Sequence, residues 1–182
     1  MHEVSLNRLI TDYLSGREIM DTTYEDLRQA LAKMLVEDRK YPKSSIKAKY
    51  ELTYDVAGES HVVQIDLAVF SPQGQPLLAL FFCPGEVGTF IRESLAAARI
   101  HLEKPFPLVA VTDSMELTLV ETRSGKILNQ GFHAVPLWWD LQPLAEAHPC
   151  PSPDSDRLDK ERRILLAYDG LGGPCCGGDC SL

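Results

Sequence analysis

The sequence predicts an α/β domain in which helices pack on a mixed β-sheet, and three observations favour this class. Residues 46–56 alternate between apolar and polar side chains, which is typical of a strand. Two further strand-like segments follow at 61–70 and 77–83, before a helical pattern over 87–102. Shorter apolar strands are expected at 108–112 and 116–121. Tight turns can join the first three strands as hairpins, whereas the helix allows a crossover to a parallel neighbour.

Two helices are expected before these strands. Residues 5–14 carry apolar side chains at helical spacing, and Gly16 would stop the helix. A second helix is expected to start at Thr22, because Thr22 and Glu25 have the spacing of a capping box. It should end before Tyr41 and Pro42, since the residue before a proline avoids helical angles.

The strand patterns also predict which side chains share a face. One face of the first strand should hold Ile46, Ala48, Tyr50, Leu52, Tyr54 and Val56, and one face of the second should hold Val63, Ile65, Leu67 and Val69. The third segment, 77–83, is continuously apolar, which is typical of a buried central strand.

The C-terminal part differs in composition. Residues 148–153 read as a proline-rich linker, residues 154–168 as a charged helix, and the chain from Gly170 is rich in glycine and cysteine. We therefore expect an N-terminal helix at 1–19, the α/β domain at 20–140, and a linker, helix and tail at 141–182.

Composition limits the functional classes. A chain of 182 residues fits one domain. No apolar run approaches the ~20 residues of a membrane span, and no signal peptide is evident, so a cytoplasmic location without a membrane partner is expected. Five cysteines, an odd number, do not form the framework of a small secreted fold, which favours reduced thiols.

Residues 22–126 resemble the N-terminal nuclease domain of type I restriction enzyme R subunits. The landmarks are Glu25-Asp26-Leu27-Arg28-Gln29, Tyr41-Pro42-Lys43, Ile65-Asp66-Leu67-Ala68-Val69, and the apolar strand 77–83 after a Gly-Gln-Pro turn. That family belongs to the PD-(D/E)xK nucleases. The resemblance implies a restriction-endonuclease-like fold with an αβββαβ core and a mixed sheet.

The resemblance places Asp66 at the family's first catalytic aspartate. The family's third strand ends in Glu-x-Lys, and its glutamate and the aspartate of the adjacent strand hold the Mg²⁺ that activates water for phosphodiester cleavage. Phe82 and Pro84 stand at the positions of the glutamate and lysine here. The site is therefore predicted to be degenerate, with Asp66 and Glu25 as remnants and no cofactor. We also expect Phe82 to be buried and Asp66 to have a protein or water partner.

Alternatives remain for the acids. Glu25 could be only the capping-box acid, and Asp66 could be a structural acid. In some members of the superfamily a catalytic group moves to the helix after the third strand, so Glu93 could pair with Asp66 in an active, Mg²⁺-dependent nuclease.

Nucleic-acid contact is predicted at Lys43, Lys47 and Lys49, in a net positive segment of a chain with net charge −8. Any such binding should be weak and salt-dependent; alternatively these lysines are simply solvated. The tail residues Cys175, Cys176 and Cys180, with Cys150 or His148, could hold Zn²⁺ or an Fe–S cluster, although the spacing fits no standard zinc pattern. The alternative is a flexible tail with incidental thiols.

The predicted function is a catalytically inactive nuclease-like module that binds or scaffolds. Its expected partners are nucleic acid, bound weakly, another protein, or a second copy of the chain. The alternatives are the nuclease with a migrated acid and a metal or redox protein that acts through the cysteine tail.

Overall fold

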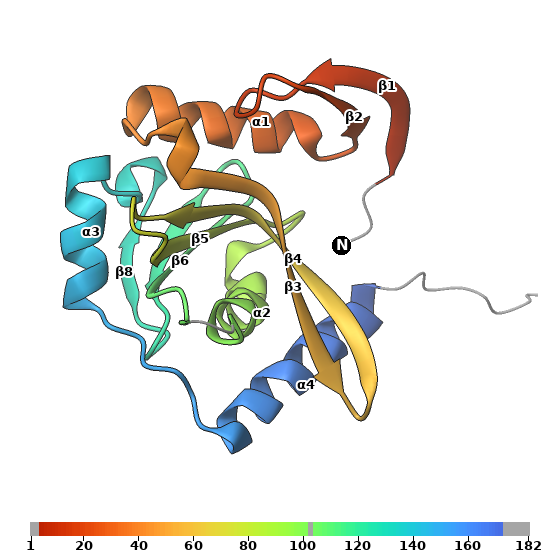
Figure 1. Cartoon of the computed structure of the whole chain (residues 1–182), viewed down its shortest axis with the longest axis vertical. Coiled ribbons are helices and arrows are strands. Elements are labelled where there is room, and N and C mark those ends of the chain that lie inside the picture. The colour runs from red at the N-terminus through yellow and green to blue at the C-terminus, as the bar shows by residue number, and fades with distance from the viewer. Residues whose placement is uncertain (1–3, 102–103, 173–182) are drawn as a thin grey trace, which may run out of the picture.

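The computed structural model describes residues 4–101 and 104–172, and its fold is shown in Figure 1. Its strands are β1 (Ser5–Thr11), β2 (Glu18–Thr22), β3 (Ile46–Val56), β4 (Glu59–Phe70), β5 (Pro76–Phe82), β6 (Leu108–Thr112), β7 (Leu117–Glu121) and β8 (Ile127–Gln130). Its α-helices are α1 (Glu25–Lys33), α2 (Val87–Arg99), α3 (Trp138–Ala147) and α4 (Ser155–Gly172). A π-helical turn, Met34–Asp38, extends α1, and short 3-10 turns span Lys43–Ser45 and Phe132–Ala134.

The main sheet has six strands in the order β3-β4-β5-β6-β7-β8. Only the β5–β6 pair is parallel within this sheet, and α2 makes the crossover between these two strands. The predicted mixed sheet with packed helices is confirmed. The bounds of β3 and β6 coincide with the predicted ones, because both segments have an unambiguous apolar pattern.

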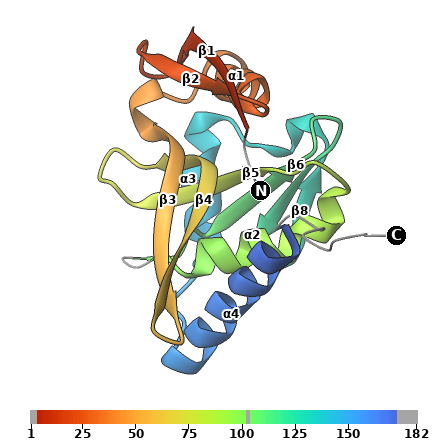
Figure 2. The ribbon, with the colours of Figure 1, turned by 90° about the vertical axis from the view of Figure 1, so that its right-hand side faces the viewer.

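Helices cover both faces of the sheet, which creates two cores (Figures 1 and 2). Under α1 and α3, Leu35 and Leu141 pack with sheet residues such as Leu80. Under α2 and α4, Leu95 and Leu165 belong to a second buried cluster. The sequence pattern did not reveal α3, which spans residue 140, and α4 follows it along the chain. Both helices nevertheless contribute buried side chains to the fold.

A buried carboxylate fixes α4 against α2. Glu161 is fully buried. Its carboxylate forms ion pairs with Arg92 at 2.7 Å, Arg99 at 3.0 Å and Arg157 at 2.7 Å. Burial opposes the charge of Glu161, but hydrogen bonds and the positive charges of the arginines outweigh it and lower its pKa. The charged helix expected at 154–168 is therefore confirmed and is joined to the fold by ion pairs.

The prediction of an N-terminal helix within residues 1–19 is wrong. Residues 5–22 form a β-hairpin in which Leu9 pairs with Met20 and Ile10 with Ile19. Its turn is closed by Gly16, at φ +69°, and by Asp12, whose carboxylate accepts the Ser15 N–H at 2.8 Å. This turn chemistry returns the chain on itself and overrides the helical spacing of the apolar residues.

The start of the next helix was also placed too early. Helix α1 begins at Glu25 with Tyr24 at its N-cap position, not at Thr22. The Glu25 side chain is hydrogen-bonded to Arg28 and Gln29, residues one turn ahead on the same helix. Pairing with Arg28 and Gln29 on its own helix accounts for the acid at this position.

The side-chain alternation of β3 and β4 reverses near Lys49 and Asp66. Ile46 packs in the core under α1, whereas Leu52 packs in the core under α2; in β4, Ile65 lies in the second core and Leu67 in the first. Ala48 pairs with Leu67 and Tyr50 with Ile65, so Lys49 and Asp66 lie between the same two pairs. The prediction that each of these strands keeps its apolar side chains on one face is thus wrong. The backbone of Lys49, at φ +50°, departs from strand geometry at this point.

Candidate functional site

Asp66 lies on β4 where the pairing with β5 stops. The last paired residues are Leu67 and Leu80, and beyond them the Asp66 Oδ2 accepts the backbone N–H of Phe82 at 2.8 Å. Its Oδ1 lies 3.5 Å from Nη2 of Arg28, and the carboxylate is 17% exposed. The expectation that Asp66 has a protein partner is confirmed.

Glu25, the second acid predicted to be a remnant, lies in the same cluster. It is 1% exposed, forms an ion pair with Arg28, and lies 2.8 Å from the ammonium of Lys49. Gln29 donates to the other Glu25 oxygen at 2.8 Å. Arg28 therefore contacts both Glu25 and Asp66, and it is itself only 2% exposed.

Gln29 joins this cluster to the N-terminal hairpin. Its amide nitrogen also donates to Asp12 at 2.9 Å, and its amide oxygen accepts the Tyr13 N–H at 2.7 Å. Burial opposes the charge of Asp12, but hydrogen bonds from Ser15 and Gln29 outweigh it and lower its pKa. The turn of the hairpin is thus held against α1 beside the acids.

The positions expected for the Glu-x-Lys pair hold no ionisable group. Phe82 is 8% exposed, as predicted, and its ring lies 5.5 Å from that of Tyr24 at an angle of 42°. Pro84 is exposed, two residues after the end of β5. Between them, Cys83 is buried, which raises the pKa of its thiol. Phe82 and Pro84 therefore supply neither a metal ligand nor a proton carrier.

The proposed migrated acid lies elsewhere. Glu93 is on α2, which packs on the face of the sheet opposite α1, and it is half-buried. Burial raises the pKa of Glu93, and the negative charge of Asp169 on α4 adds to that rise. The structure does not bring Glu93 together with Asp66, whose charged contact comes from α1.

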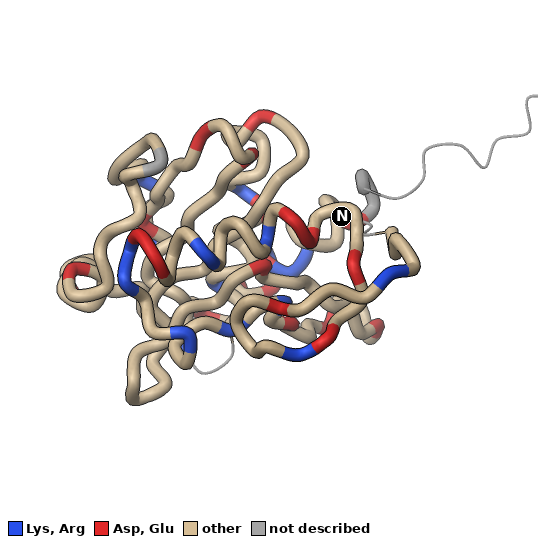
Figure 3. Tube along the Cα trace, turned by 90° about the horizontal axis from the view of Figure 1, so that it is seen from above, with Lys and Arg blue, Asp and Glu red and all other residues tan. Residues whose placement is uncertain are grey.

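The three lysines predicted to contact phosphates all have protein partners. Lys43 donates to the Tyr13 carbonyl and lies 3.8 Å above the Tyr13 ring centroid. Lys47 lies 4.4 Å above the Phe70 ring centroid, and Lys49 pairs with Glu25. Positive and negative residues are interspersed along the chain in Figure 3, not separated into two faces. A role of these lysines in nucleic-acid contact stays a prediction.

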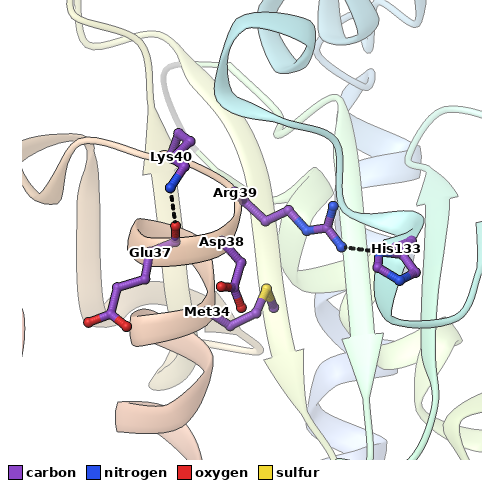
Figure 4. A pocket seen from close by; sticks show the side chains of 6 residues that line it. All are labelled: Met34, Glu37, Asp38, Arg39, Lys40 and His133. Atoms are coloured by element: carbon purple, nitrogen blue, oxygen red, sulfur yellow. Dashed lines mark hydrogen bonds between the residues drawn. The ribbon is translucent and has the colours of Figure 1, made fainter.

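Two hollows lie near the start of the fold. One, of about 440 Å³, lies between the hairpin and the start of β3, and Glu25, Asp12 and Lys49 are among its lining residues. The other, of about 520 Å³, lies at the π-helical turn (Figure 4). There the guanidinium of Arg39 reaches across to Nδ1 of His133 at 2.8 Å.

A divalent cation does not fit these residues. In residues 4–101 and 104–172, no group of three or more His, Cys, Asp or Glu side chains is placed to hold a metal ion. Glu25 and Asp66 already face Arg28. The predicted tail ligands Cys175, Cys176 and Cys180 lie outside the described residues. Of their two proposed partners, His148 is 3.0 Å from Glu121, and burial raises the pKa of Cys150.

The sequence interpretation missed Arg28, Gln29 and the charge pairing of Lys49 as parts of the site. A signal was present for the first two. Residues three and four positions apart lie on one helix face, so Glu25, Arg28 and Gln29 share a face of α1. No local signal marks Lys49, because its role depends on the reversal in β3.

The six-stranded mixed sheet with packed helices is consistent with a nuclease-like α/β fold. Residues 23–136, more than half of the chain, match the family model described as type I restriction enzyme R protein N terminus. The chain belongs to this family. Neither a curated protein nor a solved structure matches it. Among the described residues, no helix has the length and apolar character needed to cross a membrane.

Proposed function

We propose that this chain is a nuclease-like module that does not cleave nucleic acid and that acts by binding or scaffolding. The observation that carries the proposal is the state of Asp66. Its two oxygens are taken by the Phe82 N–H and by Arg28, next to a buried phenylalanine where the family has an acid. Metal-dependent hydrolysis needs carboxylate oxygens that face the cation.

A protein partner suits the surface better than a nucleic acid does. The lysines that could contact phosphates are held by Tyr13, Phe70 and Glu25, in a chain of net charge −8. The hairpin, in contrast, exposes large apolar side chains: Val4 lies just before β1, and Leu6, Leu9 and Met20 lie on the strands, each at least 45% exposed. Clustered exposed apolar residues are typical of contact surfaces between proteins.

The test is a cleavage assay on supercoiled plasmid and on single-stranded DNA with Mg²⁺ and with Mn²⁺. We expect no cleavage by the wild-type chain above the level of an Asp66→Ala variant, which is the matched control. Metal-dependent nicking that disappears in Asp66→Ala would refute the proposal. Nicking that survives in Asp66→Ala but disappears in Glu93→Gln would instead assign activity to the α2 acid.

A further inference from the structure

The cluster around Asp66 is balanced in charge by the protein itself. It holds two carboxylates, Glu25 and Asp66, and two cations, Arg28 and Lys49. The guanidinium of Arg28 spans the two acids, since Nη1 contacts Glu25 and Nη2 lies 3.5 Å from Asp66. A planar guanidinium with several fixed donors suits such a bridge.

Burial makes this arrangement hard to displace. Arg28 and Glu25 are 2% and 1% exposed. A metal ion that took the carboxylates would leave the Arg28 guanidinium buried without its counter-charge, which is strongly unfavourable. The second cation, Lys49, also contacts Glu25, although one third of its side chain is exposed.

The backbone supports the placement of Lys49. A φ of +50° is uncommon for a lysine, and such conformations persist only where the surrounding structure stabilises them. Here the strained residue lies between the Ala48–Leu67 and Tyr50–Ile65 pairs, at the point where both strands reverse their faces. The distortion accompanies the contact between the Lys49 ammonium and Glu25 on α1.

We propose that Arg28, which bridges Glu25 and Asp66, and Lys49, which pairs with Glu25, are built-in counter-cations that exclude divalent metal ions. The inference rests on the proposed function, because it explains why the acids that remain do not support cleavage. Its distinctive consequence is that loss of the Arg28 guanidinium creates a metal-binding site. With Arg28 absent, two carboxylates lie near each other with one ammonium, and hard divalent cations favour such oxygen ligands.

The test compares the wild type with Arg28→Met in two assays: Mn²⁺ binding followed by the loss of the free Mn²⁺ electron paramagnetic resonance signal, and thermal unfolding with increasing Mn²⁺ or Mg²⁺. We expect no specific binding by the wild type. In Arg28→Met, Mn²⁺ affinity should rise by at least about tenfold, and Tm should increase with Mn²⁺ because the ion binds only the folded chain.

Controls separate this effect from nonspecific binding. Arg28→Lys keeps a positive charge and should not gain Mn²⁺ affinity. Asp66→Asn added to Arg28→Met should abolish the gain. If Arg28→Met does not fold with or without metal, Arg28→Gln, which also removes the positive charge but keeps a polar side chain, replaces it and should also gain affinity.

The outcomes separate the two proposals. Mn²⁺ binding by the wild type that is lost in Asp66→Asn, without cleavage, would overturn this inference and leave the proposed function standing. Cleavage by the wild type would overturn the proposed function itself. Folded variants without a gain in Mn²⁺ affinity would show that Arg28 and Lys49 do not exclude metal.

Discussion

Replacing Phe82 by glutamate puts an acid where the resemblance to the nuclease family leads us to expect one, and the structure predicts that this change destabilises the fold. Phe82 is 8% exposed and packs against the ring of Tyr24 in the core under α1. Loss of a buried phenylalanine typically costs about 3–5 kcal/mol. The new carboxylate would also be shielded from water and lie close to Asp66, which adds to the penalty. A total of at least about 3–5 kcal/mol is a large part of the ~5–15 kcal/mol that holds a typical domain folded.

The assay is urea denaturation followed by circular dichroism, with thermal unfolding as a second measure. At about 2–4 °C per kcal/mol for a domain of this size, Tm should fall by about 6–20 °C. Val62→Glu is the matched control, because it puts the same charge on β4 at a residue that is 57% exposed, and it should change stability by less than about 0.5 kcal/mol. A Phe82→Glu variant within about 1 kcal/mol of the wild type would refute the assignment of a packed apolar pocket at the end of β5. The double variant Phe82→Glu, Pro84→Lys should also fail to nick DNA. A folded double variant that binds Mn²⁺ and nicks DNA would contradict both the packed apolar pocket and the proposed loss of the metal site.

Three further predictions concern other parts of the fold. Glu161→Gln should cost about 3–5 kcal/mol in urea denaturation, since Arg99 would lose its buried counter-charge, whereas Lys160→Gln on the exposed side should have little effect. The pKa of Glu161 is lower in the folded chain than in the unfolded chain, where it is about 4.3. The charged Glu161 therefore contributes its full stabilisation above about pH 4.3, and this stabilisation is lost as the pH falls through the folded pKa. The wild type should thus lose more stability on acidification than Glu161→Gln. Gln29→Leu should speed amide hydrogen exchange in residues 12–17 but not in α4, because it removes the bonds to Tyr13 and Asp12; equal rates would show that other contacts hold the hairpin. DNA affinity measured by fluorescence anisotropy should be weak, should fall steeply with salt, and should disappear when Lys43, Lys47 and Lys49 are neutralised together; tight binding at physiological salt in that variant would place the contact surface elsewhere.

Five of the six strands of the main sheet, β3 to β7, could be predicted because their patterns are continuous and local, whereas the short, mostly exposed β8 was missed. The alternation in 46–56 favours a strand, and the short apolar run at 77–83, bounded by a turn on each side, favours a buried strand. The hairpin at 5–22 was missed because Leu6, Leu9 and Ile10 satisfy helical spacing, whereas the deciding feature is the Asp12–Gly16 turn. Short amphipathic segments are ambiguous when turn chemistry competes with periodicity.

The candidate site could be predicted only in part. Position in the family pattern identifies Asp66, Glu25 and Phe82, and the alternation of a strand places Phe82 inward. The partners of the acids depend on long-range geometry. Lys49 was expected on a solvent-facing side with its strand neighbours, but the reversal in β3 gives it a contact with Glu25 across from α1. A period of two in the sequence cannot report an irregularity that tertiary contacts impose.

The orientation of Asp66 and the packing of the side chain at position 82 have separate causes in this structure. The orientation of Asp66 is set by the backbone N–H of residue 82 and by Arg28, and neither contact depends on the side chain at position 82. The side chain at position 82 decides instead what fills the space beside Tyr24. Restoring the family's acid therefore changes the filling of the pocket and leaves Asp66 where it is. Because the buried guanidinium of Arg28 must keep a counter-charge, the acids and the arginine stabilise one another as a unit. Asp66 and Glu25 are thus held in place by their contribution to folding, whatever else they do.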